Sequence, residues 1–483
     1  MAILYFIIVA GYLVCTLVIL FYCSCQIELF YHAITNRKKI PQHLLATDNL
    51  PNITVQLPVY NEKFVVARLI DCICKFEYPP HLLQIQVLDD STDETLSISQ
   101  QKVAAYQSLG VDIQLLHRKK RNGFKAGALQ DAMPFAKGEY IAIFDADFMP
   151  EADFLLKTIS YFTHPDIAIV QTKWLHLNQY ASLLTRLQAL QLNVHFLVEQ
   201  VGRFRGKYFL QFNGTAGVWR KSAIESAGGW QADTLTEDLD LSYRTQLKNQ
   251  KIIYTEHIGV PAELPSNMLA LKIQQFRWMK GGAACAKKLL YAAVTSPQPL
   301  SLRLQALQHL CSSSIFIIIF ILSILSIGMP AALQFYSLPT FIFSISMVSF
   351  FMLIIVYIVA NADQKWWQVI AQFFLFLAFS TGLSLHNSKA VLEGWQGKQS
   401  EFIRTPKTAS ADKLHGNKQN YKSQLFLNIT ILEFVMCVVF AISAGTGFQM
   451  GSYFLASYHL LVSIGFCGVG AFTLSAIYNQ NEH

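Results

Sequence analysis

Two aspartates that stand two residues apart, Asp145 and Asp147, are placed to bind a metal ion. They follow the very apolar run Tyr-Ile-Ala-Ile-Phe at 140–144 and precede a segment of helical pattern. Two carboxylates at the end of a strand can share a hard divalent cation, Mg²⁺ or Mn²⁺, that bridges the oxygens of a diphosphate. Many surface turns contain an Asp-x-Asp, but the position directly after a buried strand favours a metal site.

Candidate binding residues also follow two earlier apolar runs. They are Pro58, Tyr60 and Glu62 after the first run, and Asp89 and Asp90 after the second. A carboxylate at a strand end can accept a hydrogen bond from the N–H of a nucleobase. Residues 91–93 have an equally plausible structural role, because Ser91 and Asp93 can cap the helix that follows.

A basic segment at 118–127 lies between the third and fourth apolar runs. It lacks the glycine spacing and the terminal Lys-Ser/Thr of a Walker A loop, which disfavours ATP hydrolysis. Lys125 stands at the start of a predicted helix, where a lysine and free backbone N–H groups can meet a phosphate together. A solvated basic loop describes Lys119 and Lys120 better than Lys125.

Four acidic and aromatic motifs occur in a fixed order along the chain. They are Asp-Asp at 89–90, Asp-x-Asp at 145–147, Thr-Glu-Asp at 236–238 and Gln-Gln-Phe-Arg-Trp at 274–278. In this order the chain resembles the inverting, processive glycosyltransferases of family 2, which include cellulose synthase. The stretch from Phe212 to Trp278 is most similar to the glucomannan and mannan synthases of the cellulose-synthase-like A group and their bacterial relatives. The resemblance covers about Thr54 to Lys288.

The resemblance implies a role for each motif. Asp238 would be the base that takes the proton from the acceptor hydroxyl, and Asp145 and Asp147 would hold the divalent cation. The nucleotide sugar would contact Pro58, Tyr60, Glu62, Asp89, Asp90, Lys125, Asp145, Gln274 and Arg277. The acceptor sugar would contact Asn213, Gly214, Thr215, Glu237 and Trp278. Two alternatives remain: Trp278 as a core or interfacial aromatic residue, and Glu237 and Asp238 as residues that favour a helix N-terminus.

Short apolar runs alternate with segments of helical period in the middle of the chain. The runs predict strands at 53–57, 85–88, 113–116, 140–144 and 167–171, and the segments predict helices at 62–76, 94–109, 124–136 and 151–162. Such alternation predicts βαβ units and a mainly parallel sheet that binds ligands at the carboxyl ends of its strands. We therefore expect an α/β domain, which the resemblance identifies as a Rossmann-like GT-A fold.

Long stretches without charge surround this domain. Residues 1–27 and 304–362 contain no Asp, Glu, Lys or Arg, whereas a bilayer is crossed by about 20 apolar residues. We expect five spans, at 2–23, 309–333, 338–360, 424–445 and 453–477. Residues 366–388 are also uncharged but precede a basic stretch, so we expect an interfacial helix with Trp366 and Trp367 as anchors. The predicted domains are an anchor at 1–35, a cytoplasmic domain at 48–300 and a membrane region at 301–483.

The composition excludes a wholly soluble, a fibrous and a disordered protein, because 53% of the 483 residues are apolar and 14% are charged. The net charge of +7 is concentrated next to the spans, as in Arg37, Lys38 and Lys39, which indicates topology rather than a nucleic-acid partner. The catalytic domain is then cytoplasmic, in a plasma (inner) or Golgi membrane. The N-terminal segment is expected to be a retained anchor, and the nine cysteines free thiols.

The basic stretch at 389–422 contains Phe402, Thr405 and Lys407 in the sequence Phe-Ile-Arg-Thr-Pro-Lys. It resembles the gating loop of cellulose synthase, with Arg404 in place of a valine. The resemblance implies that Thr405 and Lys407 contact the diphosphate when the loop closes the site. A plain basic juxtamembrane loop is the alternative.

Three functions are compatible with these features. We expect an enzyme that moves mannose or glucose from GDP-mannose or UDP-glucose onto a growing β-1,4-linked polysaccharide and passes the chain through its own spans. The alternative enzyme adds one sugar to a ceramide or polyprenyl lipid. A transporter with a nucleotide-sensing domain is disfavoured, because the spans carry almost no ionisable residue besides Glu433. The sequence does not determine the donor, the metal or an accessory subunit.

Overall fold

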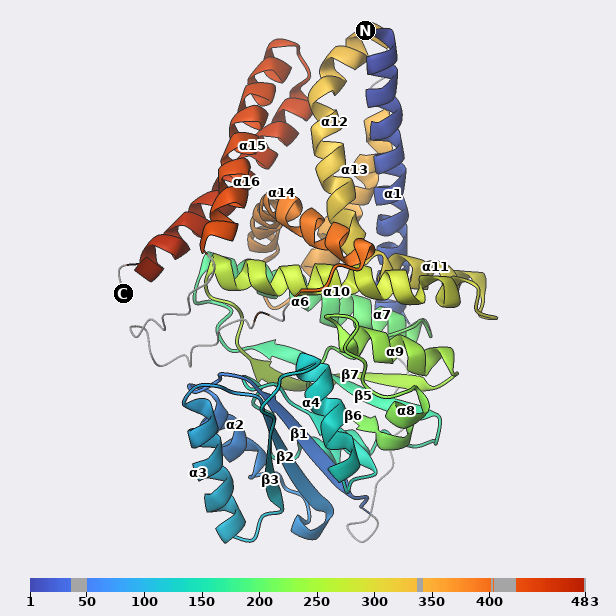
Figure 1. Cartoon of the computed structure of the whole chain (residues 1–483). Helices are drawn as coiled ribbons and strands as arrows, with labels where there is room; N and C mark the ends of the chain where they lie inside the picture. Colours follow the sequence, from blue (N-terminus) through green and yellow to red (C-terminus); the bar gives the residue numbers. More distant parts are fainter. Residues whose placement is uncertain (36–49, 337–341, 401–402, 404–422, 482–483) are drawn as a thin grey trace.

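The computed structural model describes residues 1–35, 50–336, 342–400, 403 and 423–481, without the side chains of 342–349, 423–425 and 480–481. An α/β layer lies at one end and a bundle of long helices at the other (Figure 1). The long helix α10 (Met268–Val294) runs between the two layers. The side chain of Asn267 accepts a hydrogen bond from the backbone N–H of Ala270 at 2.9 Å, which caps the start of α10.

A seven-stranded mixed sheet forms the α/β layer, with the order β3-β2-β1-β4-β6-β5-β7. Its strands are β1 (Ile53–Val59), β2 (Leu83–Asp89), β3 (Ile113–His117), β4 (Tyr140–Ile143), β5 (Ile167–His176), β6 (Gly217–Arg220) and β7 (Lys251–Ala262). Strands β1 to β4 are parallel, and β6 runs antiparallel to both β4 and β5. The five predicted strands are present. The sequence pattern missed β6, which is four residues long, and β7, which has no clean alternation.

The helices around the sheet confirm the βαβ pattern. They are α2 (Val66–Ile73), α3 (Thr95–Ser108), α4 (Phe124–Ala132), α5 (Phe154–Ile159), α6 (Leu183–Val194), α7 (Gln200–Arg205), α8 (Lys221–Ser226) and α9 (Glu237–Leu247). Short helical turns lie at Pro80–Leu82, Met133–Phe135 and Ser312–Ser314, and a π-helix at His195–Glu199 joins α6 to α7. The four predicted helices are present, but α2 and α5 are several residues shorter than predicted.

The centre of the sheet is covered on both faces. Every residue of β2 and β4 is buried, as expected for parallel strands with helices on each side. Polar side chains within this core pair across strands: Thr54 donates to Gln84 at 2.7 Å, and Gln56 donates to Gln86 at 3.0 Å. The strand ends are therefore held in a fixed register, which fixes the loops that follow them.

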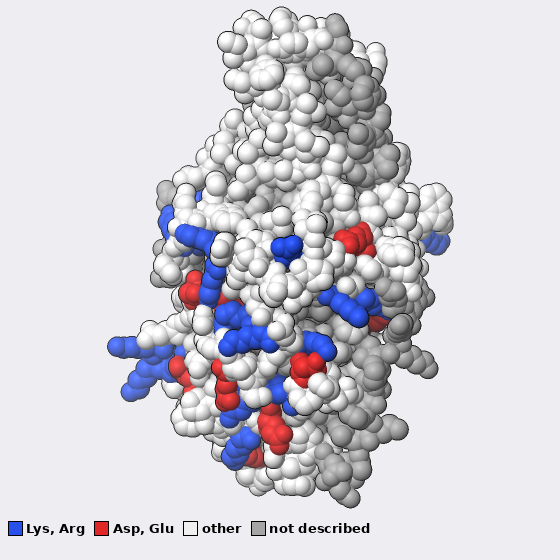
Figure 2. Space-filling view, turned by 90° about the vertical axis from the view of Figure 1, so that its right-hand side faces the viewer, with Lys and Arg blue, Asp and Glu red and all other residues white. Residues whose placement is uncertain are grey.

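The helical layer is apolar enough to lie in a membrane. Its helices are α1 (Ala2–Thr35), α11 (Leu300–Leu310), α12 (Ile315–Tyr336), α13 (Ile342–Ala360), α14 (Trp366–Gln396), α15 (Ser423–Gln449) and α16 (Tyr453–Asn481). Within the described residues, five helices are long and apolar enough to cross a membrane, at 2–35, 312–336, 366–396, 426–449 and 453–479. Figure 2 shows the upper part of one face without Lys, Arg, Asp or Glu. The chain is therefore a multi-pass membrane protein.

These five helices are not the same set as the five predicted spans. The predicted span 338–360 lies partly outside the described residues; its described helix is α13, with side chains described from residue 350 onward. By length and composition, α14 qualifies as a span, although the sequence predicted an interfacial helix there. Figure 1 shows α14 directly above α10 and inclined to the upright helices α1 and α12. The interfacial assignment of 366–388 therefore stays a prediction.

Two buried charges link α10 to the membrane layer. The Lys272 ammonium on α10 donates to both carboxylate oxygens of Glu433 on α15, at 2.8 and 2.9 Å, and both side chains have no exposed surface. Burial lowers the pKa of Lys272, and the Glu433 carboxylate counteracts this effect. Each charge is stable in this position only because the other is present.

Replacement of Glu433 by Leu should leave the Lys272 ammonium buried without its counter-charge, at a cost of about 3–5 kcal/mol of unfolding free energy. The double variant Lys272→Met/Glu433→Leu replaces both charges by apolar side chains and should recover most of that loss. Thermal unfolding of the purified protein in detergent measures both. Equal unfolding temperatures for the single and double variants would show that the pair does not hold α15 against α10.

Candidate active site

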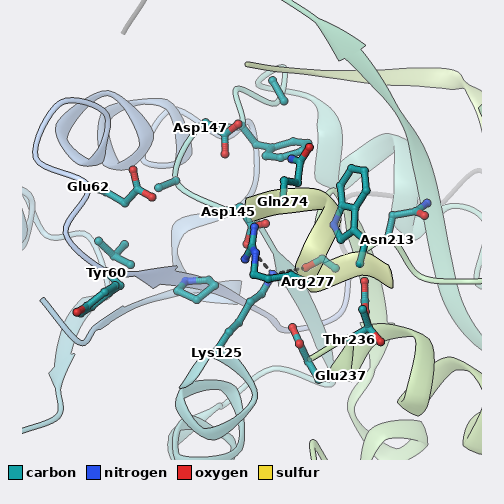
Figure 3. Close-up of a pocket in the computed structure, with 18 of the residues that line it drawn as sticks. Tyr60, Glu62, Lys125, Asp145, Asp147, Asn213, Thr236, Glu237, Gln274 and Arg277 are labelled. Carbon is teal, nitrogen blue, oxygen red and sulfur yellow. Dashed lines mark hydrogen bonds and ion pairs between the residues drawn. The ribbon is translucent and has the colours of Figure 1, made fainter. Parts of the chain in front are cut away.

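A cavity of about 200 Å³ lies at the carboxyl ends of β1, β2 and β4, with α10 along one side. Predicted site residues line it together: Pro58, Tyr60, Glu62, Asp90, Lys125, Asp145, Asp147, Asn213, Gly214, Glu237, Asp238, Gln274, Arg277 and Trp278. Figure 3 shows several of their side chains directed towards a common space. Motifs that are up to 220 residues apart in the sequence therefore meet in one pocket.

The loop after β4 presents the two aspartates of the Asp-x-Asp. The Asp145 backbone N–H donates to the Thr215 hydroxyl at 2.9 Å, and the Asp145 carboxylate accepts from the Lys125 ammonium at 2.6 Å. Asp147 is 4% exposed and accepts from the backbone N–H of Glu263 at 3.3 Å. Each carboxylate is thus held in place by the residues around it.

The donor set suits a hard divalent cation. Asp145 and Asp147 both line the cavity and offer only oxygen atoms. Among the described residues no group of three or more His, Cys, Asp and Glu side chains is placed to hold a metal. A cation bound here would complete its coordination with water or diphosphate oxygens, which is how Mg²⁺ is commonly held at phosphate sites.

Lys125, at the start of α4, is the cationic centre of the pocket. Its ammonium donates to Asp145 and, at 2.8 Å, to the carbonyl oxygen of Gly214. Burial lowers the pKa of Lys125, but the carboxylates of Asp145, Glu237 and Asp238 outweigh burial and raise the pKa above the ordinary lysine value. Lys125 is therefore positively charged at neutral pH and compensates three acidic groups.

Asp238 lies in the first turn of α9. Its Oδ1 accepts from the backbone N–H of the next residue, Leu239, at 2.8 Å, whereas the N-cap position of α9 is Thr236. Its Oδ2 remains directed to Gly214, where an added Cβ would lie only 3.1 Å away. Burial, followed by the neighbouring Glu237, raises the pKa of Asp238 to about 7. The carboxyl can therefore both accept and release a proton near neutral pH.

Glu237 is buried beside this group. Burial raises the pKa of the Glu237 carboxyl, whereas the Lys125 ammonium acts in the opposite direction. Two adjacent acids of this kind raise one another's pKa when both are charged. Glu237 thereby helps to keep Asp238 near the pKa that suits a base.

Asp90, rather than Asp89, faces the cavity at the end of β2. Both oxygens of Asp90 accept from the Arg118 guanidinium, at 2.8 and 2.6 Å. Asp89 is fully buried and accepts from the backbone N–H of Ser91 at 2.7 Å. Of the two aspartates that the sequence offered for base recognition, only Asp90 reaches the cavity wall.

The basic segment contributes a residue that the sequence did not assign. The Arg121 guanidinium lies 3.5 Å from the centre of the Tyr60 ring, a cation–π contact, and lines the cavity. Asp90 and Arg121 both line the cavity. The run of basic residues at 118–121 was the feature of the sequence that could have indicated this role for Arg121.

One face of α10 contributes Gln274, Arg277 and Trp278, at the i, i+3 and i+4 spacing that places side chains together on a helix. Burial lowers the pKa of Arg277 to about 10, and nearby acids, Asp145 first, counteract burial. Arg277 is thus still charged at neutral pH. Together with Arg121 and Lys125, Arg277 gives the cavity three basic side chains beside its acidic groups.

Two further lining residues on β5, Trp174 and His176, were not predicted from the sequence. The strand continues five residues beyond its predicted end, because pairing with β7 extends it past the apolar run. The indole nitrogen of Trp174 and Nε2 of His176 are buried without a hydrogen-bond partner among the described residues. Burial lowers the pKa of His176 to about 4, so the ring is neutral at pH 7.

Other predicted residues are not part of the cavity wall. Thr215 is fully buried and supports the loop after β4. Asp93 accepts from the backbone N–H of Thr95 at 3.0 Å, but the N-cap position of α3 is Glu94, and no described side chain caps the helix there. Phe402, Thr405 and Lys407 lie outside the described residues, so the gating assignment stays a prediction.

Comparisons with known proteins agree with this geometry. Residues 51–281 match a family described as glycosyltransferase like family 2. Glucomannan 4-beta-mannosyltransferase 2 of Arabidopsis thaliana is 34% identical over 412 residues, which cover 82% of this chain and 76% of that protein. Probable glucomannan 4-beta-mannosyltransferase 1 of the same plant is 42% identical over 247 residues, covering 50% of this chain and 45% of that protein. The chain thus spans about half the length of several curated relatives.

A solved structure shares the fold. A mannosyltransferase from Pyrobaculum calidifontis, in complex with GDP-Man and Mn²⁺, superposes with a TM-score of 0.56 at 17% identity and covers 81% of this chain. All of that protein is covered. The predicted fold class, an α/β GT-A domain with a mainly parallel sheet joined to a helical membrane bundle, is confirmed.

Gly214 should tolerate no side chain, for two separable reasons. Its φ of +79° is unfavourable for any residue with a Cβ, and an added Cβ would meet Asp238 Oδ2 at 3.1 Å and Lys125 Nζ at 3.5 Å. We expect Gly214→Ala to lower the unfolding free energy by about 1 kcal/mol and to weaken binding of a nucleoside diphosphate with Mn²⁺.

Gly110→Ala is the matched control, because Gly110 has a φ of +83° but nothing within 4 Å of an added Cβ. Gly110→Ala should lower the unfolding free energy by the same amount, measured by thermal unfolding. It should leave binding of the nucleoside diphosphate, measured by calorimetric titration, unchanged. Loss of binding in both variants, or in neither, would contradict the close approach of Gly214 to the charged cluster.

Proposed function

The chain belongs to glycosyltransferase family 2, and from this premise we propose that it is an inverting hexosyltransferase that extends a β-1,4-linked polysaccharide. One observation carries the proposal: Asp238, with a pKa near neutrality, lies in the same pocket as Lys125 and the Asp145–Asp147 pair. A proton acceptor thus stands beside groups suited to a nucleoside diphosphate. This is the combination that a single displacement at an anomeric carbon requires.

The donor is proposed to be a nucleotide sugar, with GDP-mannose first and UDP-glucose second. Relatives whose alignments cover up to 82% of this chain are described as glucomannan 4-beta-mannosyltransferases, which favours mannose as the donor sugar. The base would lie near Tyr60, Asp90 and Arg121, at the β2 end of the cavity. The diphosphate would lie between Lys125 and Arg277, whose positive charges favour the departing group.

Asp145 and Asp147 are proposed to hold Mn²⁺ or Mg²⁺. Such a cation supplies charge neutralisation for the leaving diphosphate. The protein's own residues supply the rest: Asp238 removes the proton from the acceptor hydroxyl, and Trp278 offers an apolar face on which the acceptor sugar can stack. Glu237 and Asn213 lie within the same wall and can bind sugar hydroxyls.

The membrane layer suggests where the product goes. The cavity lies against α10, and α10 packs on α14 and on α15 through the Lys272–Glu433 pair. We propose that the α/β layer faces the cytoplasm and that the growing chain leaves the pocket towards the helical bundle. Transfer of one sugar to a membrane lipid would use the same pocket, and the length of the product distinguishes the two.

Asp238→Asn should lower transfer from GDP-mannose or UDP-glucose at least 100-fold, because the amide cannot take a proton. Binding of the donor should change little, since the shape of the side chain is kept. Labelled donor and purified membranes measure transfer, and the length of the labelled product measures processivity.

Asp233→Asn is the control, on an exposed carboxylate in the loop before α9 that pairs with Lys288 at 2.8 Å. It should transfer at the wild-type rate. If Asp238→Asn also transferred sugar at that rate, Asp238 would not be the base. If the organic extract contained a product with a single added sugar, the acceptor would be a lipid and not a polysaccharide.

The pH dependence should follow the protonation of Asp238. A base with a pKa of about 7 is mostly protonated at pH 6 and mostly charged at pH 8, so the transfer rate should rise across this interval. Glu237→Gln removes the charge that raises the Asp238 pKa, so its rising limb should shift to lower pH. A bound cation affects the wild type and Glu237→Gln alike, so the difference between their pH–rate profiles is the test. A shift to higher pH, or none, would contradict the assignment.

A further inference from the structure

The π-helix His195–Glu199 interrupts the helical segment that leads to Arg205, directly behind the pocket wall. A π-turn inserts an extra residue, weakens the local backbone ladder and is frequent at functional sites. His195 and Glu199 lie side by side in it, with His195 Nδ1 2.9 Å from a Glu199 oxygen. Each side chain is about one-quarter exposed.

A chain of side-chain hydrogen bonds passes through this pair from α1 to the pocket. Gln26 on α1 donates to the other Glu199 oxygen at 2.7 Å. On the opposite side, His195 Nε2 lies 3.0 Å from Oδ1 of Asn213. Asn213 is the member of the chain that lines the cavity.

The chemistry of the four groups determines the direction of each bond. A carboxylate can only accept, so His195 donates from Nδ1 to Glu199. The amide oxygen of Asn213 faces Nε2 and can only accept, so this bond is donated from Nε2. Burial raises the pKa of the Glu199 carboxyl, but His195, Arg203 and Gln26 outweigh burial and lower it to about 2, so this carboxylate is charged.

The other half of the Asn213 amide is then left without a partner in the described part of the chain. Asn213 is 9% exposed, and its Nδ2 has no hydrogen-bond partner among the described residues. Its backbone N–H donates to Gln171 at 2.9 Å, which fixes the main chain at this point. A buried amide without a partner is costly unless a ligand completes it. Because Asn213 lines the cavity, an oxygen of a molecule bound there would complete the hydrogen bonding of this NH₂.

We propose that His195 is a positioning residue that sets the Asn213 amide so that its NH₂ donates to a hydroxyl oxygen of the acceptor sugar. The inference rests on the proposed function and adds to it the group that selects the acceptor. If His195 could not donate from Nε2, the amide would be free to turn its oxygen to the cavity. The N-terminal helix contributes through Gln26, which holds Glu199 in place.

Two substitutions of His195 separate this role from simple packing. Glutamine places its amide nitrogen near the position of Nε2 and can still donate to Asn213. Asparagine places its amide nitrogen near Nδ1, so it can donate to Glu199 but does not reach Asn213. We expect His195→Asn to raise the KM for a manno-oligosaccharide acceptor about tenfold, the effect of one buried hydrogen bond, with the donor KM unchanged. We expect His195→Gln to stay within twofold of wild type.

Gln308→Leu is the matched control, because Gln308 accepts from Arg203 at 2.8 Å in the same buried layer but does not line the cavity. It should lower the unfolding temperature and leave the ratio of acceptor KM to donor KM unchanged. Equal acceptor KM values for His195→Asn and His195→Gln, or a parallel rise in donor KM, would overturn the proposal.

Binding of the oligosaccharide to the purified protein, followed by tryptophan fluorescence, gives the same comparison without turnover. A wild-type protein that transfers no sugar from either donor would refute the proposed function. Weaker binding by His195→Asn than by His195→Gln would still support the positioning role. Equal binding by the two variants, or no binding by wild type, would refute that role.

Discussion

The ammonium of Lys125 is the interaction on which the pocket depends. Three acidic groups, Asp145, Glu237 and Asp238, come from two distant parts of the chain and would repel one another without it. Lys125 also donates to the Gly214 carbonyl, so the same cation holds the loop that approaches Asp238. Like charges crowded in a half-buried pocket raise one another's pKa. One lysine thus sets both the geometry and the protonation of the acids.

The second constraint is the position of α10. Its residues Gln274, Arg277 and Trp278 face the cavity, while Lys272 on the same helix is paired with Glu433 in the helical layer. Since a buried ion pair is stable only when both partners stay in place, a shift of the bundle would move the pocket wall. Chemistry at the sheet edge and packing among the membrane helices are mechanically coupled through one helix.

Sequence patterns predicted the parts of the site that depend on local order. Asp145, Asp147 and Asp90 follow apolar strands, and the carboxyl ends of parallel strands meet at one edge. Pairings between distant segments had no such signal. Trp174 and His176 were missed because β7 pairing, not an apolar run, extends β5. The contact between His195 and Asn213 joins two separate segments, one of them a π-helix, and no periodicity indicates it. The antiparallel strand β6 was missed because its four residues are too few to show a pattern.

The length of α1 has a consequence for the integrity of the protein. A helix of 34 residues extends about 50 Å, whereas the apolar core of a bilayer is about 30 Å thick. The surplus descends into the α/β layer, where Leu29 is fully buried and Glu28 accepts from Tyr208 and Gln305. The globular half therefore lacks a closed surface of its own. Severing it after residue 35 would expose hydrophobic interior to water, so we expect the two halves to fold as a single cooperative unit.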